Sequence, residues 1–291
     1  MYRRFKPYIL VAPLLVFLGA TFYFGLGNGL LQSFGAVPGA LESRLTLRYY
    51  REVLGETSFF ISLLYTVYVA LVATVVSNLL GIVGAFAMLG LKRESKWPKF
   101  FYQLPLVVPH LVVVILVFHL FSQTGLFSRL AWRLRLVAEA NDFPLLVFDP
   151  GAVGVILVYL YKQIPFVSMI VFGTLGSISK SFAEVAYNLG ASRAMLISQV
   201  FLPLLRPTIL SVFLMTFTFS FGAFEVPFLL GSPAWNMLPV KAYVYYTNVD
   251  LTYRAQAMVV NVMITVISIG LVVAYSHAAH LRQRMGNGGD I

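Results

Sequence analysis

The sequence predicts an all-α integral membrane protein with six transmembrane helices. The chain has 291 residues, of which 59% are hydrophobic and 11% are charged, and its mean hydropathy is +0.83. Soluble domains carry about a quarter charged residues, so this deficit indicates a membrane protein. The sequence has no strands of alternating polarity typical of a membrane barrel, so helices must satisfy the backbone in lipid.

Six apolar stretches are long enough to cross a hydrocarbon core about 30 Å thick, which takes roughly 20 helical residues. We predict spans at residues 7–31, 59–91, 101–121, 151–175, 207–230 and 257–280. The first follows the basic segment MYRRFK but is longer than the apolar core of a signal peptide, so we expect it to be retained. Residues 1–291 then form a single transmembrane domain.

The net charge of +10 follows the predicted topology. With the N-terminus inside, the inner segments are residues 1–6, 92–99, 177–206 and the tail after Leu281. They hold twelve Lys and Arg against three acidic residues, whereas the outer loops hold eight against seven. Because Lys and Arg concentrate in cytoplasmic segments, we expect both termini in the cytoplasm. The basic residues do not cluster on a soluble face, so no nucleic-acid partner is expected.

Three outer loops are longer than hairpins, at residues 32–58, 122–150 and 232–256. The middle loop predicts a short amphipathic helix in SRLAWRLRLVAEANDFPLLVFDP, which we interpret as a lid packed over the bundle or lying at the lipid interface. The C-terminal GNGGDI is typical of a disordered end. The sequence contains no cysteine, which excludes disulfides and Cys metal sites.

Several predicted spans contain proline, which removes a backbone donor and kinks a helix. The prolines are Pro105, Pro109, Pro165 and Pro227. In membranes such kinks are tolerated where a neighbouring group or water satisfies the freed carbonyl, as in transporter cavities. Proline is also commoner in membrane helices generally, but four of them favour a bundle that moves.

Between the fourth and fifth spans lies a helical segment that is not apolar enough to be lipid-embedded, SFAEVAYNLGASRAMLISQVFLP. Ser181 and Glu184 have the spacing of a capping box that starts a helix. Gly190 is expected to end that helix, since glycine tolerates positive φ, and Ser192 to start a second one. The pattern predicts two short helices with a corner, on the cytoplasmic side.

This segment resembles the cytoplasmic loop signature of the permease subunits of binding-protein-dependent ABC importers of type I, the superfamily of the maltose and polyamine permeases. The signature is Glu-Ala-Ala, a glycine six residues after the glutamate, then an apolar residue, any residue and Leu-Pro. The matching residues are Glu184, Ala186, Gly190, Ala191, Val200, Leu202 and Pro203. The chain departs from it at Val185, where alanine is usual, and at Leu189, where aspartate is common. The resemblance covers residues 59–280.

The resemblance implies a type I ABC importer permease fold whose loop, residues 177–206, is a coupling helix. Two permeases would pair, and each loop would dock on one of two cytoplasmic ATPase subunits. The implied coupling residues are Glu184, Ala186, Leu189, Gly190, Ala191, Arg193, Leu202 and Pro203. The plainer alternative is that Glu184 only caps its helix and Gly190 only ends it.

No motif for catalysis or metal binding appears in the sequence. The phosphate-binding pattern G-x-x-x-x-G-K-[ST] is absent, and the nearest segment, GTLGSISKS, has no glycine before its lysine. The histidines His110, His119, His277 and His280 form no metal-ligand pattern with carboxylates. We expect a subunit that is not an enzyme and holds no cofactor, with ATP and Mg²⁺ bound by the partner ATPase subunits.

Two charged residues, Lys162 and Glu225, lie within predicted spans. A charge there is costly and typically faces a cavity or a partner, which makes both candidates for a translocation pathway. The alternatives are an ion pair between the two residues, or snorkelling of a long side chain. For Lys162 the sequence favours neither the structural nor the pathway interpretation, whereas for Glu225 it favours the pathway. Weaker candidates for the same route are Gln163, Thr218 and Asn261.

The sequence therefore predicts a permease subunit of an ABC importer in a prokaryotic plasma (inner) membrane. Expected partners are membrane lipid, a second permease that is a distinct homologue, two ABC ATPase subunits, an extracytoplasmic solute-binding protein and a small-molecule substrate. The stretch FGAFEVPFLLG resembles the polyamine, thiamine and ferric-iron branch, which favours a small charged solute such as a polyamine. The alternatives are a sugar or oligosaccharide importer, and a membrane-embedded enzyme or regulator that uses the loop for docking.

Overall fold

The computed structural model of the chain describes residues 2–37, 44–89, 96–188 and 190–287, and all regular structure within them is helical. Within these residues, six helical stretches are long and apolar enough to cross a membrane, which confirms the predicted fold class. The chain forms two compact units, Met1–Phe60 with Leu238–Val266 and Ile61–Met237 with Ile267–Ile291. Helices α3 and α12 each contribute to both units.

The first unit contains one long apolar helix and several shorter packing elements. Its elements are α1 (Tyr2–Ser33), α2 (Arg48–Gly55), α11 (Leu238–Tyr246) and the first part of α12 (Thr252–Asn287). Both α2 and α11 fall inside segments predicted as outer loops. The end of α1 is joined to α2 by a hydrogen bond of 2.8 Å between the hydroxyls of Ser33 and Tyr50.

A second polar cluster holds the first unit together where α2 meets the start of α3. The ammonium of Lys241, on α11, donates to Ser58 Oγ at 2.6 Å and to Glu56 Oε2 at 3.4 Å. The hydroxyl of Tyr245 donates to the same carboxylate oxygen at 2.8 Å. We call Glu56, Ser58, Lys241 and Tyr245 the clasp.

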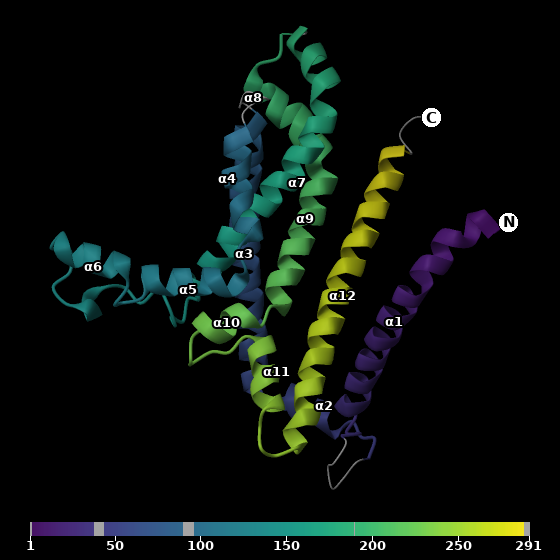
Figure 1. The fold of residues 1–291 in the computed structure, drawn as a ribbon, viewed down its shortest axis with the longest axis vertical. Helices are drawn as coiled ribbons and strands as arrows, with labels where there is room; N and C mark the ends of the chain where they lie inside the picture. The colour runs from purple at the N-terminus through teal and green to yellow at the C-terminus, as the bar shows by residue number, and fades with distance from the viewer. Residues whose placement is uncertain (1, 38–43, 90–95, 189, 288–291) are drawn as a thin grey trace. The chain divides into compact units, whose positions relative to one another are not determined.

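The second unit is the larger helical bundle (Figure 1). Its elements are most of α3 (Thr57–Leu89), α4 (Lys96–Val107), α5 (His110–Phe121), α6 (Leu126–Arg133), η1 (Ala140–Asp142), α7 (Val153–Asn188), α8 (Arg193–Met195), η2 (Leu196–Phe201), α9 (Leu202–Gly222), α10 (Glu225–Leu230) and the end of α12. Helix α7 is central, because it packs against α4, α5, α9 and α10.

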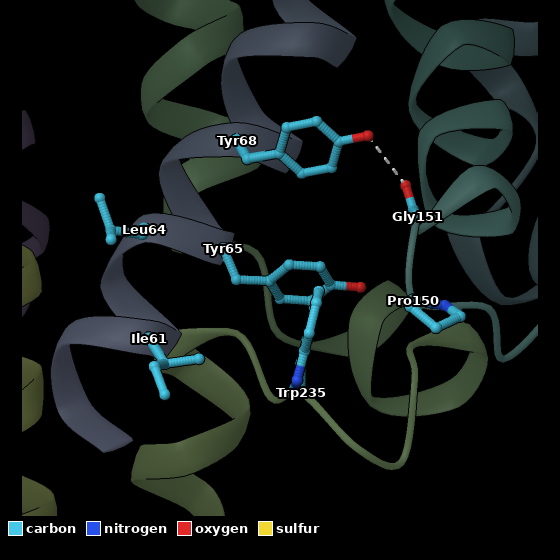
Figure 2. Close-up of a pocket in the computed structure, with 7 residues that line it drawn as sticks. All are labelled: Ile61, Leu64, Tyr65, Tyr68, Pro150, Gly151 and Trp235. Carbon is cyan, nitrogen blue, oxygen red and sulfur yellow. Dashed lines mark hydrogen bonds between the residues drawn. The ribbon is translucent and has the colours of Figure 1, made fainter. Parts of the chain in front are cut away.

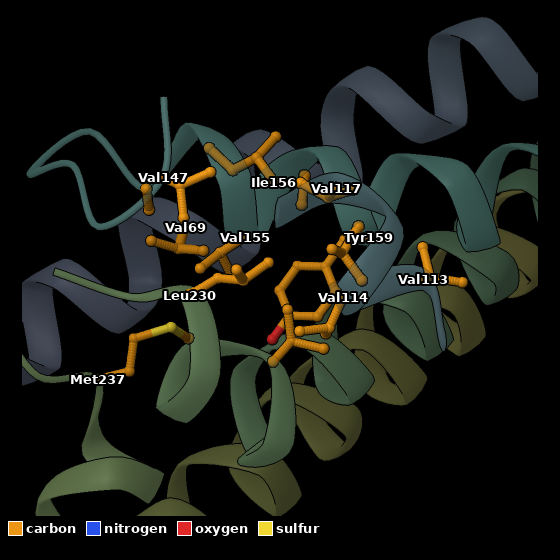
Figure 3. Packing of buried hydrophobic residues seen from close by; sticks show 14 of the residues in the cluster. Val69, Val113, Val114, Val117, Val147, Val155, Ile156, Tyr159, Leu230 and Met237 are labelled. Carbon is orange, nitrogen blue, oxygen red and sulfur yellow. The ribbon is translucent and has the colours of Figure 1, made fainter. Parts of the chain in front are cut away.

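The core of the second unit is built mainly from branched aliphatic side chains of α3, α5, α7 and α10, which Figure 3 shows interdigitating around the ring of Tyr159. Val69, Val155 and Leu230 are almost fully buried in it. Because lipid is as apolar as these side chains, close packing rather than exclusion of water supplies the attraction between membrane helices. The cluster fixes α5 and α10 against α7.

Helices α3 and α7 approach each other closely at Gly81. A Cβ at this position would lie 2.6 Å from Cβ of Val167, so a larger residue would push the two helices apart. The hydroxyl of Ser168 donates to the carbonyl of Gly81 at 2.6 Å. Small residues permit such close contacts between membrane helices.

The third span differs from its prediction at residues 101–121. Helix α4 ends at Val107 and α5 begins at His110, and Figure 1 shows α5 leaving the direction of α4 at a steep angle. The cause is Pro109, which has no N–H to continue the hydrogen bonds of α4. The stretch apolar enough to cross a membrane is His110–Arg133. A short helix is present in the segment predicted as the middle loop, α6 (Leu126–Arg133), but it belongs to this apolar stretch.

The capping box predicted at Ser181 and Glu184 is wrong, because α7 runs without a break from Val153 to Asn188. The sequence between the fourth span and Ser181 contains no proline, so nothing there forces the helix to end. The α7 helix instead begins next to Asp149, whose carboxylate accepts from the backbone N–H of Val153 at 2.9 Å.

The fifth and sixth spans also have different bounds from those predicted. The helix predicted to start at Pro207 begins earlier, at Arg193, and ends at Gly222, and the remaining residues form the separate helix α10. Helix α12 begins at Thr252 rather than at residue 257. The last four residues of the segment predicted to be disordered lie outside the described residues.

Candidate functional site

The corner predicted between the two helices of the coupling loop is present. Gly190 has φ of +81°, a left-handed conformation that favours glycine. Ser192 then caps the next helix, because its hydroxyl accepts from the backbone N–H of Met195 at 3.3 Å. We call residues Gly190–Ser192 the elbow. The chain therefore reverses direction there through local chemistry visible in the sequence.

After the elbow, the helix does not end at Leu202 and Pro203 but passes through a π-helical turn, η2, into α9. In this turn the N–H of Leu202 donates to the carbonyl of Ile197, five residues back. Pro203 lacks an N–H and its ring crowds the carbonyl four residues earlier, which accounts for a wider turn just before it. Helix α8, the π-helical turn η2 and helix α9 thus follow one another without a break.

The segment after the elbow is packed against α7. Leu196 and Phe201 are buried in a cluster with Leu175 of α7 and Leu205 of α9. This packing ties the segment after the elbow to the long helices α7 and α9. This is the property that a coupling element needs.

The predicted coupling residues are distributed around the elbow. Gly190 and Arg193 are exposed, while Ala191, Leu202 and Pro203 are half-buried. Positions 184 and 186 lie in the last turns of α7, but their side chains are outside the description, as is the whole of Leu189. The exposed and described part of the candidate site is therefore the elbow and the first turn after it.

Lys162 lies within α7 at the break between α4 and α5. Its ammonium donates to three backbone carbonyls, those of Pro105 at 2.9 Å, Leu106 at 3.1 Å and Val108 at 2.6 Å. No ion pair joins Lys162 to Glu225 among the described residues, so the pairing considered from the sequence is not formed. Glu225 is instead an exposed residue at the start of α10.

Gln163, the neighbour of Lys162, is buried between three helices. Its amide oxygen accepts from Ser77 of α3 at 2.9 Å, and its amide nitrogen donates to Ser220 of α9 at 2.6 Å. The next residue on α3, Asn78, donates to the hydroxyl of Thr216 at 3.0 Å. Helices α3, α7 and α9 are therefore joined by buried polar side chains. Thr74 is buried beside them, but within the described residues its hydroxyl has no hydrogen-bond partner. We call these residues the polar core: Thr74, Ser77, Asn78, Gln163, Thr216 and Ser220.

Most of the polar core was missed in the sequence. A signal was available, because Thr74, Ser77 and Asn78 recur at helical spacing within an apolar span, as do Thr216 and Ser220. Of the softer candidates, Thr218 is half-buried and its hydroxyl has no hydrogen-bond partner within the described part of the chain. Asn261 is exposed on α12.

A pocket of about 550 Å³ opens beside the first turns of α3 in the second unit. Figure 2 shows the rings of Tyr65, Tyr68 and Trp235 on its walls, with Pro150 and Gly151 opposite α3. Tyr65 and Trp235 pack edge to face with ring centres 5.7 Å apart. Tyrosine and tryptophan gather at the boundary between lipid and water, so this end of α3 is expected to lie at that boundary.

The family of the chain is shown by comparison with known proteins. The model of the family "Binding-protein-dependent transport system inner membrane component" matches residues 77–287, which include Lys162, Gln163 and the elbow. The chain belongs to this family. This confirms the resemblance of its loop to the permease subunits of ABC importers.

Several curated permeases are similar in sequence. A putative ferric transport system permease protein, FbpB 1 of Haemophilus influenzae, is 26% identical over 68% of this chain and 30% of its own length. The spermidine/putrescine permease PotC of Shigella flexneri is 26% identical over 51% of this chain and 55% of its own. The putrescine permease PotI of Escherichia coli K12 is 22% identical over 82% of this chain and 79% of its own length. The chain thus spans a third to a half of the first two relatives.

The fold also matches a solved structure over nearly its whole length. A chain in the crystal structure of a bacterial ABC transporter involved in the import of the acidic polysaccharide alginate has a TM-score of 0.75, with 18% identity, and the match covers 96% of this chain and 98% of that one. At this identity the likeness concerns the fold alone.

Proposed function

We propose that the chain forms half of the translocation pathway of an ABC importer and transmits ATP-driven movement into the membrane through its elbow. The observation that carries the proposal is the elbow itself. Gly190, with positive φ, and Ser192, which caps the following helix, stand at the positions of the loop signature in a chain that belongs to the permease family. The buried Leu196 and Phe201 make the segment rigid enough to act as a lever.

The proposed assembly contains a second permease, a distinct homologue, with two ABC ATPase subunits beneath and an extracytoplasmic solute-binding protein above. ATP and Mg²⁺ bind to the ATPase subunits. The elbow and both termini face the cytoplasm of a prokaryote, and the pocket lined by Trp235 faces the outer side. The excess of basic residues on the elbow side supports this orientation.

The proposed solute is small and charged, with a polyamine as the first candidate. Two of the relatives are polyamine permeases, and a third is a ferric permease, so all three import cations. The exposed carboxylate of Glu225 suits a cationic solute. A saccharide is the second candidate, because the loop signature is shared with the maltose permeases.

The coupling role is tested by cross-linking in membranes of the native host. The chain has no cysteine, so a single Met195→Cys substitution gives one reactive thiol, on an exposed side chain three residues after the elbow. We expect a short bifunctional reagent to join it to an ABC ATPase subunit, and ATP with vanadate to change the yield. The matched control is Met215→Cys, which is also exposed but lies far along α9.

If Met195→Cys and Met215→Cys behave alike, or if the product contains no ATPase subunit, the coupling role is wrong. The solute is tested separately, by uptake of labelled spermidine and putrescine into cells that express the complete transporter. Competition by polyamines but not by saccharides is expected, and the reverse would overturn the first candidate.

A further inference from the structure

The break between α4 and α5 leaves three carbonyls without the partners that a continuous helix would give them. The carbonyl of Pro105 would accept from the N–H of residue 109, but Pro109 has none. The carbonyl of Val108 would accept from Val112, whose N–H donates instead to Pro109 at 3.1 Å. The third carbonyl, that of Leu106, lies in the same last turn. Such orphan carbonyls are costly in a membrane unless another group satisfies them.

Lys162 satisfies all three carbonyls at once. A lysine ammonium has three N–H donors, and here each has one acceptor within 3.1 Å. The partial negative charge at the C-terminal end of a helix also favours a cation at this place. The charge of Lys162 is therefore compensated by backbone dipoles rather than by the carboxylate of Glu225.

The same contact connects two parts of the bundle that are far apart in sequence. Lys162 belongs to α7, which continues for about 40 Å beyond it to the elbow. The carbonyls belong to the bend that sets the direction of α5, and α5 packs through Val113 and Val117 into the core beside α10. A shift of α7 thus acts directly on the bend.

We infer that Lys162 is a positioning residue: its ammonium holds the bend between α4 and α5 to α7, so that movement of α7 is passed on to α5. The inference rests on the proposed function for its consequence in transport, but the geometry of the bend is independent of it. Lys162 need not touch the solute for its loss to stop transport.

The first test measures the bend directly. Spin labels at Leu104→Cys on α4 and Leu126→Cys at the start of α6 report the distance across the bend, and both positions are exposed. Lys162→Met is expected to shift and broaden the distance distribution in the purified complex, and Lys162→Arg to restore it. The matched control is Arg133→Met, which removes an exposed positive charge and should leave the distribution unchanged.

The second test measures uptake in the same variants. Lys162→Met is expected to lower the uptake rate about tenfold or more, since hydrogen bonds to a charged group are lost, and Lys162→Arg to recover most of it. If uptake falls while the distance distribution stays unchanged, Lys162 acts on the solute and the inference is wrong. If neither changes, it is also wrong.

A third variant keeps the inference testable if Lys162→Met does not fold. Pro109→Ala supplies the N–H that the carbonyl of Pro105 lacks, so the double variant Pro109→Ala/Lys162→Met can satisfy part of the break by straightening the helix. We expect it to recover membrane yield relative to Lys162→Met but to keep the altered distance. A double variant with no better yield would mean that the carbonyls do not need Lys162. Failure of uptake in the unmodified complex would bear on the proposed function alone.

Discussion

The ammonium of Lys241 and the carboxylate of Glu56 lie 3.4 Å apart although 185 residues separate them in the chain. The Lys241 side chain is only 9% exposed, whereas that of Glu56 is 37% exposed. A buried cation needs a nearby acceptor, and Glu56 with Ser58 supplies it. The clasp therefore joins the start of α3 to α11. The hydroxyl of Tyr245, also on α11, donates a second hydrogen bond to the same carboxylate.

The clasp predicts a loss of stability in acid. Burial acts to raise the pKa of the Glu56 carboxyl, but hydrogen bonds from Tyr245 and Ser58 and the charge of Lys241 outweigh it, so the pKa lies below its ordinary value of 4.5. Because the folded protein binds this proton less readily than the unfolded chain, the stabilisation is complete above about pH 4.5 and is lost as the pH falls through the folded-state pKa. Midpoints of thermal unfolding in detergent between pH 7 and pH 3.5 measure it.

Glu56→Gln should remove most of that pH dependence and lower stability at neutral pH by about 1–2 kcal/mol, because a neutral amide replaces a charge-assisted acceptor. Glu52→Gln is the matched control in the same unit. Glu52 pairs with Arg48, whose side chain is 70% exposed, and an i,i+4 pair of this kind is worth about 0.3–0.5 kcal/mol. Its other partner, the amide of Gln256 at 3.1 Å, can still donate to the amide oxygen of a glutamine at this position. Equal effects of the two substitutions on the acid transition would contradict the role of the clasp.

The proposed orientation predicts opposite accessibility of the two ends of the second unit. Ser192→Cys at the elbow and Ala234→Cys beside Trp235 are both exposed positions in a chain without cysteine. A membrane-impermeant maleimide should label Ala234→Cys in intact spheroplasts, and Ser192→Cys only after the membrane is opened. Labelling of Ser192→Cys from outside would reverse the topology and remove the elbow from any cytoplasmic partner.

Substitutions at Gly190 can distinguish two causes of uncoupling, a strained backbone at the elbow and a lost contact with a partner. No atom lies within 4 Å of a Cβ built at Gly190, so only its φ of +81° resists substitution in the chain itself. Valine should distort the elbow at a cost of about 1–2 kcal/mol, whereas asparagine tolerates this conformation. In ATPase assays of the complex, uncoupling by Gly190→Val alone would indicate the backbone. Uncoupling by Gly190→Asn as well would indicate that this surface touches a partner.

Features written locally in the chain were predictable from the sequence. Gly190 and Ser192 form the elbow through their own backbone and hydroxyl chemistry, and the six spans follow from length and hydropathy. The capping box at Ser181 was misleading for a physical reason. A cap forms only where a helix must start, and α7 had already started at Val153 with nothing to end it.

Contacts between distant segments could not be predicted in the same way. Lys162 was recognised as costly in lipid, but its partners are backbone carbonyls more than fifty residues earlier, which carry no sequence signature. Pro109 was expected to kink a helix, yet two separate helices meet there, and the ammonium of Lys162 binds the carbonyls of the break. The pairing within the polar core likewise depends on which faces of three helices meet.

The polar core and Glu225 predict different outcomes for two substitutions of similar size. Gln163 is 4% exposed and hydrogen-bonds to Ser77 and Ser220. Gln163→Leu should therefore lower the stability of the complex by about 1–3 kcal/mol, and uptake should fall in proportion to the amount of folded protein.

Glu225→Gln changes an exposed residue and should leave the stability of the complex within about 0.5 kcal/mol of the unmodified value. It should lower the uptake of a cationic solute per folded complex. Thermal unfolding and uptake normalised to complex measure the two effects. Glu139→Gln, which neutralises another exposed carboxylate, is the control for a general response to the loss of a surface charge. If Gln163→Leu abolishes uptake in complexes of unchanged stability, Gln163 belongs to the pathway rather than to the scaffold, and if Glu225→Gln leaves uptake unaltered, Glu225 does not.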